Sequence, residues 1–107
     1  MFLKKNDDGY KAVLDKIRQK TLVFGDKSLL TEFRLEQGAL LPSHHHPHEQ
    51  TGYLVSGRMD LTIGDTTHPV EPGDSWCIPG GTPHCAVALA DSVAIEVFAP
   101  VREDYRP

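Results

Sequence analysis

The segment GALLPSHHHPHEQTGYLVSG, residues 38–57, holds four of the six histidines of this 107-residue chain. Successive side chains of a β-strand point to opposite faces, so in extended backbone His44 and His46 share one face and His45 points away. Two imidazoles on one face make half of a metal site. The next positions supply three candidates for a third ligand: His48, Glu49 and Gln50.

A further ligand has to come from elsewhere in the chain. His84 is the best remote candidate, because it follows the turn sequence PGGTP. Imidazole binds Zn, Fe, Ni, Cu and, less well, Mn. Histidine clusters also occur in surface loops, so the residues by themselves leave both a metal site and a solvated loop open.

Outside the histidine segment the sequence alternates apolar and polar residues. LLTEFRLE (29–36) and RMDLTI (58–63) follow the period of two that indicates half-buried strands. Gly-Asp pairs at 25–26 and 64–65 predict hairpin turns. Only residues 10–20 are ambiguous, since their apolar positions also fit one helical turn. About eight short antiparallel strands are expected, which predicts an all-β jelly-roll or sandwich filling one domain, residues 1–107.

Composition narrows the functional classes. The net charge is -4 and the eleven Lys and Arg residues are scattered, which argues against a nucleic-acid surface. No apolar run is long enough to span a membrane, and the N-terminus lacks the apolar stretch of a signal peptide. With two cysteines the chain has no disulfide framework, so a reduced, cytoplasmic protein is expected.

Two spaced patterns resemble the motifs of the cupin superfamily. Residues 38–57 read G-x5-H-x-H-x3-Q-x6-G, and residues 73–84 read G-x5-P-x-G-x2-H. The usual forms carry Glu where this chain has Gln50, and an Asn after the second motif where this chain has Ala88. The resemblance implies a cupin-type double-stranded β-helix, that is, a jelly-roll barrel of short antiparallel strands.

By position, the resemblance also implies a ligand set: His44, His46, Gln50 and His84. The implied cofactor is a divalent transition metal, one of Zn, Ni, Fe, Mn or Co. All four ligands are neutral, so the metal would keep its full positive charge. Such a metal is a stronger Lewis acid toward a bound oxygen and attracts an anionic substrate.

The stretch SVAIEVFAP, residues 92–100, is apolar on both faces of a predicted strand except at Glu96. Such a strand is expected to be buried on both faces, and a carboxylate in it needs a partner, a cavity or a raised pKa. Alternatively, the strand lies at a sheet edge and Glu96 meets solvent.

The ending EVFAPVREDY, together with HPHEQ and LVSG, resembles the pectin-degradation cupins. Those enzymes open the rings of unsaturated uronate monosaccharides to linear keto acids. The resemblance implies Glu96 as the proton-transferring acid, Phe98 as a pocket aromatic and Arg102 as the partner of the substrate carboxylate. The acid of the family pattern is Asp, so Glu96 is longer by one methylene.

Two other function classes remain: a cupin dioxygenase, against which Gln50 counts because those enzymes usually keep the Glu ligand, and a non-catalytic module that binds a small anion or a metal. The resemblance also implies a homodimer. Other residues have simpler interpretations: Trp76 is expected in the core or an interface and His68 at the surface. Tyr53, near Gln50, is a candidate for the pocket mouth, and neither cysteine is expected to bind the metal.

Overall fold

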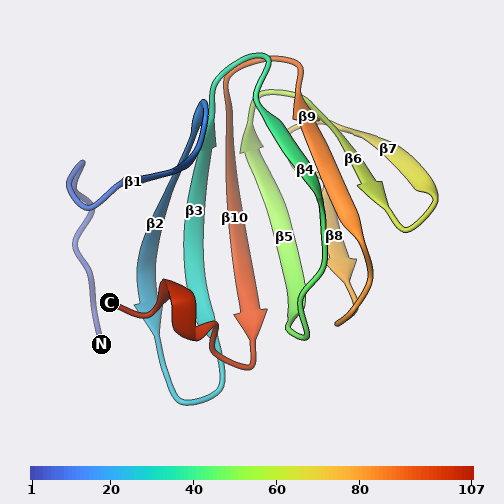
Figure 1. The fold of residues 1–107 in the computed structure, drawn as a ribbon. Coiled ribbons are helices and arrows are strands. Elements are labelled where there is room, and N and C mark those ends of the chain that lie inside the picture. The colour runs from blue at the N-terminus through green and yellow to red at the C-terminus, as the bar shows by residue number, and fades with distance from the viewer.

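Ten β-strands form two antiparallel sheets in the computed structural model, which describes residues 1–107 (Figure 1). The larger sheet has the order β1-β2-β3-β10-β5-β8, with β1 Lys11–Leu14, β2 Ile17–Phe24, β3 Leu29–Leu35, β10 Ser92–Ala99, β5 Glu49–Ser56 and β8 Ser75–Ile78. The smaller has the order β4-β9-β6-β7, with β4 Leu40–His44, β9 His84–Ala88, β6 Met59–Ile63 and β7 Thr66–Val70. A 3-10 turn, η1 Glu103–Tyr105, follows β10.

The all-β prediction is confirmed, and both Gly-Asp pairs lie in hairpin turns, between β2 and β3 and between β6 and β7. The ambiguous residues 10–20 form a third hairpin instead of a helical turn. Lys16 there has a φ of 63°, a left-handed conformation that reverses the chain between β1 and β2. Val13 and Leu14 are exposed, whereas Ile17 is buried, so these three residues do not form one apolar face. No helix in the structure has the length and apolar character needed to cross a membrane.

The core lies between the two sheets. Its main cluster joins inward side chains of both sheets, among them Leu54 of β5 and Met59 and Leu61 of β6. A second cluster of Leu29, Phe98 and Val101 closes the end near η1. Alternation along each strand therefore places one face in the core, as the sequence pattern predicts.

Strand β10 lies between β3 and β5 in the larger sheet, so the alternative of an edge strand is wrong. Its inner face carries Ala94 and Phe98, which are buried, with Glu96 between them. The expectation that both faces are buried is also wrong, because the outer-face residues Val93, Ile95 and Val97 stay partly exposed. A single chain has no second layer over the outer face of the larger sheet.

Gly57 directly follows β5 in a left-handed conformation with φ 94°, and a Cβ there would lie 2.2 Å from Ser92 Oγ and 2.4 Å from the Asp91 carbonyl. Gly64, with φ 59°, has nothing within 4 Å of its Cβ position. Gly64→Ala should therefore cost only the left-handed penalty, about 1–2 kcal/mol. Gly57→Ala should destabilise the fold by roughly 1–3 kcal/mol more, because its methyl group overlaps backbone. Urea unfolding of both variants checks this, and equal midpoints would contradict the close approach.

Candidate metal centre and its pocket

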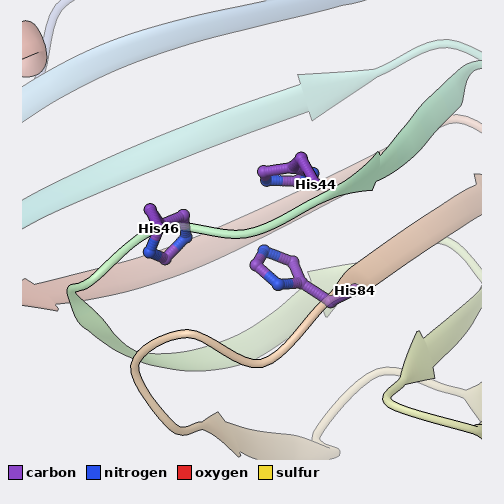
Figure 2. Close-up of side chains that lie close together, drawn as sticks. All are labelled: His44, His46 and His84. Atoms are coloured by element: carbon purple, nitrogen blue, oxygen red, sulfur yellow. The ribbon is translucent and has the colours of Figure 1, made fainter.

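Three histidines, His44, His46 and His84, lie close together in the structure (Figure 2). His44 ends β4 and His84 begins β9, and the two are directly paired across these strands. His46 lies two residues beyond β4, in the loop that leads to β5. One ring nitrogen from each histidine lies within 4.8 Å of the others. The strand pairing and the short loop thus bring together three of the predicted ligands.

Each of the three rings is oriented by a backbone carbonyl. The Nδ1 atoms of His44, His46 and His84 contact the carbonyl oxygens of Pro42, His48 and Thr82 at 2.9, 3.1 and 2.9 Å, respectively. A carbonyl oxygen only accepts, so each Nδ1 carries the proton and donates it. Each neutral ring then has a lone pair on Nε2, the arrangement that second-shell partners give to metal-binding histidines.

The buried Nε2 of His84 has no hydrogen-bond partner. Burial lowers the pKa of His84 below its ordinary value, and the neighbouring His44 and His46 lower it further. Burial, followed by the charge of Arg102, also lowers the pKa of His46. These rings are therefore held neutral, as a metal ligand must be, and the unpartnered nitrogen of His84 fits a bound cation.

Gln50 completes the group with a contact that the neutral His46 ring does not satisfy. Its Nε2 donates to Glu96 Oε1 at 2.6 Å, which turns its Oε1 toward His46 Nε2 at 3.0 Å. With the His46 proton on Nδ1, two acceptors face each other, His46 Nε2 and Gln50 Oε1. If the proton were on Nε2 instead, Nδ1 and the His48 carbonyl oxygen would be the two facing acceptors. A cation bound by both atoms removes it, so the four predicted ligands fit a divalent metal.

Glu96 lies beside this group in the same pocket. Its Oε1 accepts from Gln50 and also from Trp76 Nε1, at 3.1 Å. Burial raises the pKa of the Glu96 carboxyl above its ordinary value, while the two hydrogen bonds and the charge of Arg102 act in the opposite direction. A carboxyl with a raised pKa next to a candidate metal site suits proton transfer.

Trp76 agrees with the sequence interpretation that placed it in the core or an interface, and it makes a further contact that the sequence did not predict. Its ring does pack against the core cluster, but its indole N–H is committed to Glu96. Tyr105 is a second residue that the sequence analysis missed. It lines the pocket and packs edge-on against Phe98, with ring centroids 5.6 Å apart. One feature of the sequence could have indicated the contact of Trp76: a buried indole N–H needs a hydrogen-bond acceptor.

Phe98 and Arg102 lie next to each other in the lining of the pocket. The Arg102 guanidinium carbon is 5.0 Å from the Phe98 ring centroid and 4.2 Å from that of Tyr105. Its Nε bonds Asp104 at 3.0 Å. Phe98 is fully buried and meets His46 edge-on. The pocket that Phe98, Arg102 and Tyr105 help to line has a volume of about 60 Å³, room for roughly two water molecules.

Other predicted positions lie outside the pocket. His45, Glu49 and His68 are exposed, the last as expected. Tyr53 does not line the pocket mouth. Successive residues of a strand point to opposite faces, so Gly52 faces the pocket side of β5 and Tyr53 faces the outer side, where it is 49% exposed. Both cysteines are free, and Cys77 contacts Glu49 on that outer side.

Comparison with known proteins agrees with this geometry. The cupin domain family matches residues 31–99. The chain belongs to the cupin family. The pectin degradation protein KdgF of Dickeya dadantii is 27% identical, over 85% of this chain and 84% of that protein. The structure of KdgF from Halomonas sp. superposes with a TM-score of 0.93 at 29% identity, over 99% of this cupin and 100% of that chain. The predicted family, fold and resemblance to pectin-degradation cupins are thereby confirmed.

A third relative is the H2HPP isomerase of Bacillus subtilis. It is 30% identical over 82 residues, which are 76% of this cupin but only 34% of that protein. The cupin thus spans about a third of the length of this relative. The shared part is a cupin-sized unit rather than the whole Bacillus enzyme.

Replacing His84 with alanine should weaken metal binding more than about tenfold, since losing a ligand costs at least as much as losing its orienting partner. His45→Ala is the matched control, because His45 is a neighbouring histidine that is exposed and points away. Elemental analysis of both variants after dialysis against a limiting divalent metal measures the difference. Equal metal content in the two would refute the assignment of His84.

Proposed function

We propose that this cupin opens the ring of an unsaturated uronate monosaccharide. The observation that carries the proposal is the Gln50–Glu96 hydrogen bond of 2.6 Å, which joins the candidate metal site to a partly buried carboxyl in one pocket. The likeness to KdgF proteins along nearly the whole chain supports the same chemistry. A sugar acid also suits a pocket that combines a guanidinium with neutral metal ligands.

The proposed cofactor is a divalent transition metal, Zn, Ni, Fe, Mn or Co, held by His44, His46, Gln50 and His84. When bound, it supplies Lewis-acid polarisation of a substrate oxygen and attraction for negative charge. The four ligands leave its charge uncompensated. Glu96, which binds Gln50 through the amide N–H, is the nearest carboxylate of the pocket, and it stays available for protons instead of serving as a ligand.

The proposed role of Glu96 is to carry one proton from oxygen to carbon. It accepts the proton of the anomeric hydroxyl while the bond between the anomeric carbon and the ring oxygen breaks. The electron pair of that bond remains on the ring oxygen as an enolate, and the anomeric carbon becomes an aldehyde. Glu96 then returns the proton to the distal carbon of the former double bond, which leaves a ketone. The product is an isomer, so no co-reactant is needed.

Arg102 and Phe98 have proposed roles in holding the substrate. The guanidinium, held against the rings of both Phe98 and Tyr105, is pre-oriented to pair with the uronate carboxylate as a charged fork. That carboxylate is conjugated with the double bond, so a fixed positive charge also stabilises the enolate that forms. Phe98 supplies the apolar wall between Arg102 and His46. The pocket volume of about 60 Å³ requires the sugar to extend out of the pocket mouth.

Glu96→Gln tests the proposal, because it keeps the shape of the side chain and removes its capacity to accept a proton. Turnover of an unsaturated uronate, followed by the loss of ultraviolet absorbance of the conjugated double bond, should fall more than about 100-fold. Metal content should be unchanged, and a saturated uronate should give no reaction with either protein. Full activity in the variant would sink the role of Glu96, and an inactive, metal-loaded wild type would favour a binding module.

Gln50→Glu separates metal binding from chemistry. The variant restores the charged ligand of the usual cupin motif, so metal should resist removal by a chelator better than in the wild type. It also removes the N–H donor and places two carboxylates in contact, so turnover should fall at least about tenfold. Gln37→Glu, at an exposed position, controls for added charge. Turnover at or above the wild-type rate would contradict the proposed link between Gln50 and Glu96.

The homodimer stays a prediction. The outer face of the larger sheet leaves Tyr53 and Val55 each 49% exposed, which suits pairing with a second copy. Sedimentation velocity of the wild type and of Val55→Lys would check it.

A further inference from the structure

Trp76 reaches Glu96 across an intervening strand. Trp76 lies on β8 and Glu96 on β10, and β5 separates these strands in the larger sheet. One residue of β5 faces both: Gly52 is paired with Glu96 on one side and with Trp76 on the other. Strands two apart in a sheet are roughly 9–10 Å from each other. The indole therefore has to cross β5 for its N–H to meet the carboxylate at 3.1 Å.

The crossing depends on the absence of a side chain at position 52. A Cβ on Gly52 would lie 2.2 Å from Trp76 Cε2 and 2.3 Å from its Nε1. No side chain carries Cβ contacts that short, so the N–H edge of the indole occupies the space that any other residue would fill. Gly52 has no left-handed φ, and the reason for glycine here is space alone.

The two donors to Glu96 both bind the same oxygen. Gln50 Nε2 and Trp76 Nε1 donate to Oε1, and no side-chain donor binds Oε2. Gln50 belongs to β5 and Trp76 to β8, so the carboxylate is held by two neighbouring strands of the sheet. A glutamate has three side-chain torsions, and fixing one oxygen from two directions restricts them strongly.

We propose that Trp76 is a positioning residue: its indole N–H, lying over Gly52, fixes Oε1 of Glu96 and leaves Oε2 as the oxygen that transfers the proton. This inference rests on the proposed function of Glu96 and assigns Trp76 and Gly52 to it. If Trp76 served only to pack the core, its indole N–H would not affect turnover.

Trp76→Phe keeps an aromatic ring on the core and removes the N–H. We expect kcat to fall on the order of tenfold with KM within about twofold, because the substrate contacts are unchanged while the acid/base group loses its orientation. In a Glu96→Gln background Trp76→Phe should have little further effect on kcat, since both substitutions act through the proton transfer by Glu96. Equal losses in the two backgrounds would assign Trp76 a purely structural role.

A second measurement does not require turnover. Trp76 is the only tryptophan, so its indole N–H gives a single assignable NMR resonance. That resonance should shift in Glu96→Gln, where the charged acceptor is lost, and stay in place in Glu71→Gln, an exposed control. A resonance that does not respond to Glu96→Gln overturns the inference. Failure of wild-type turnover with a responsive resonance would instead refute the proposed function and keep the Trp76–Glu96 contact.

Gly52→Ala supplies the third variant. Its methyl group should displace the indole and reproduce both the kinetic loss and the shifted resonance. Gly25→Ala is the matched control, because its Cβ position has nothing within 4 Å and its φ is ordinary. A folded Gly52→Ala protein with wild-type kcat and an unshifted indole resonance would refute the crossing.

Discussion

The amide of Gln50 is the interaction on which the rest of the site depends. Its oxygen lies 3.0 Å from a histidine nitrogen and its nitrogen donates to Glu96 at 2.6 Å. A carboxylate at position 50 has no such donor and would repel Glu96, so the amide is the side chain of this size that satisfies both neighbours. The departure from the usual cupin motif at position 50 is therefore explained by its neighbour Glu96, a partly buried carboxylate on the adjacent strand β10.

The sheet makes this arrangement possible because β10 is central. An inward residue of a central strand has neighbours on two sides, so Glu96 of β10 meets donors from β5 and, over Gly52, from β8. At an edge the same carboxylate would be solvated and its pKa ordinary. The smaller sheet contributes differently: the direct pairing of His44 with His84 sets two rings side by side before any metal binds. The strand pairings that build the two sheets are therefore the same pairings that position the side chains of the site.

The sequence predicted what depends on local periodicity and spacing. Alternation separated His44 and His46 from His45, and the motif spacing placed Gln50 and His84 in the set that the structure brings together. It failed where the outcome depends on which strands become neighbours. Alternation tells which face a residue occupies, but Trp76 meets Glu96 only because of sheet order. The β1–β2 hairpin was ambiguous for a related reason. Its apolar residues do not share one buried face, so the sequence shows neither the apolar period of a strand nor that of a helix.

The pectin-degradation pattern carries aspartate where this chain has Glu96, and the surroundings of Glu96 suit the longer side chain. One more methylene adds a torsion and moves the carboxylate by more than an ångström, which by itself would loosen the geometry of the proposed proton transfer. Here two donors converge on Oε1 and restrict that freedom, one from Gln50 and one from Trp76. Both require particular neighbours: an amide instead of a carboxylate at 50, and no side chain at 52. Glutamate at 96 is thus accommodated by the amide at 50 and by the indole N–H of Trp76, and the indole reaches it only because position 52 is glycine.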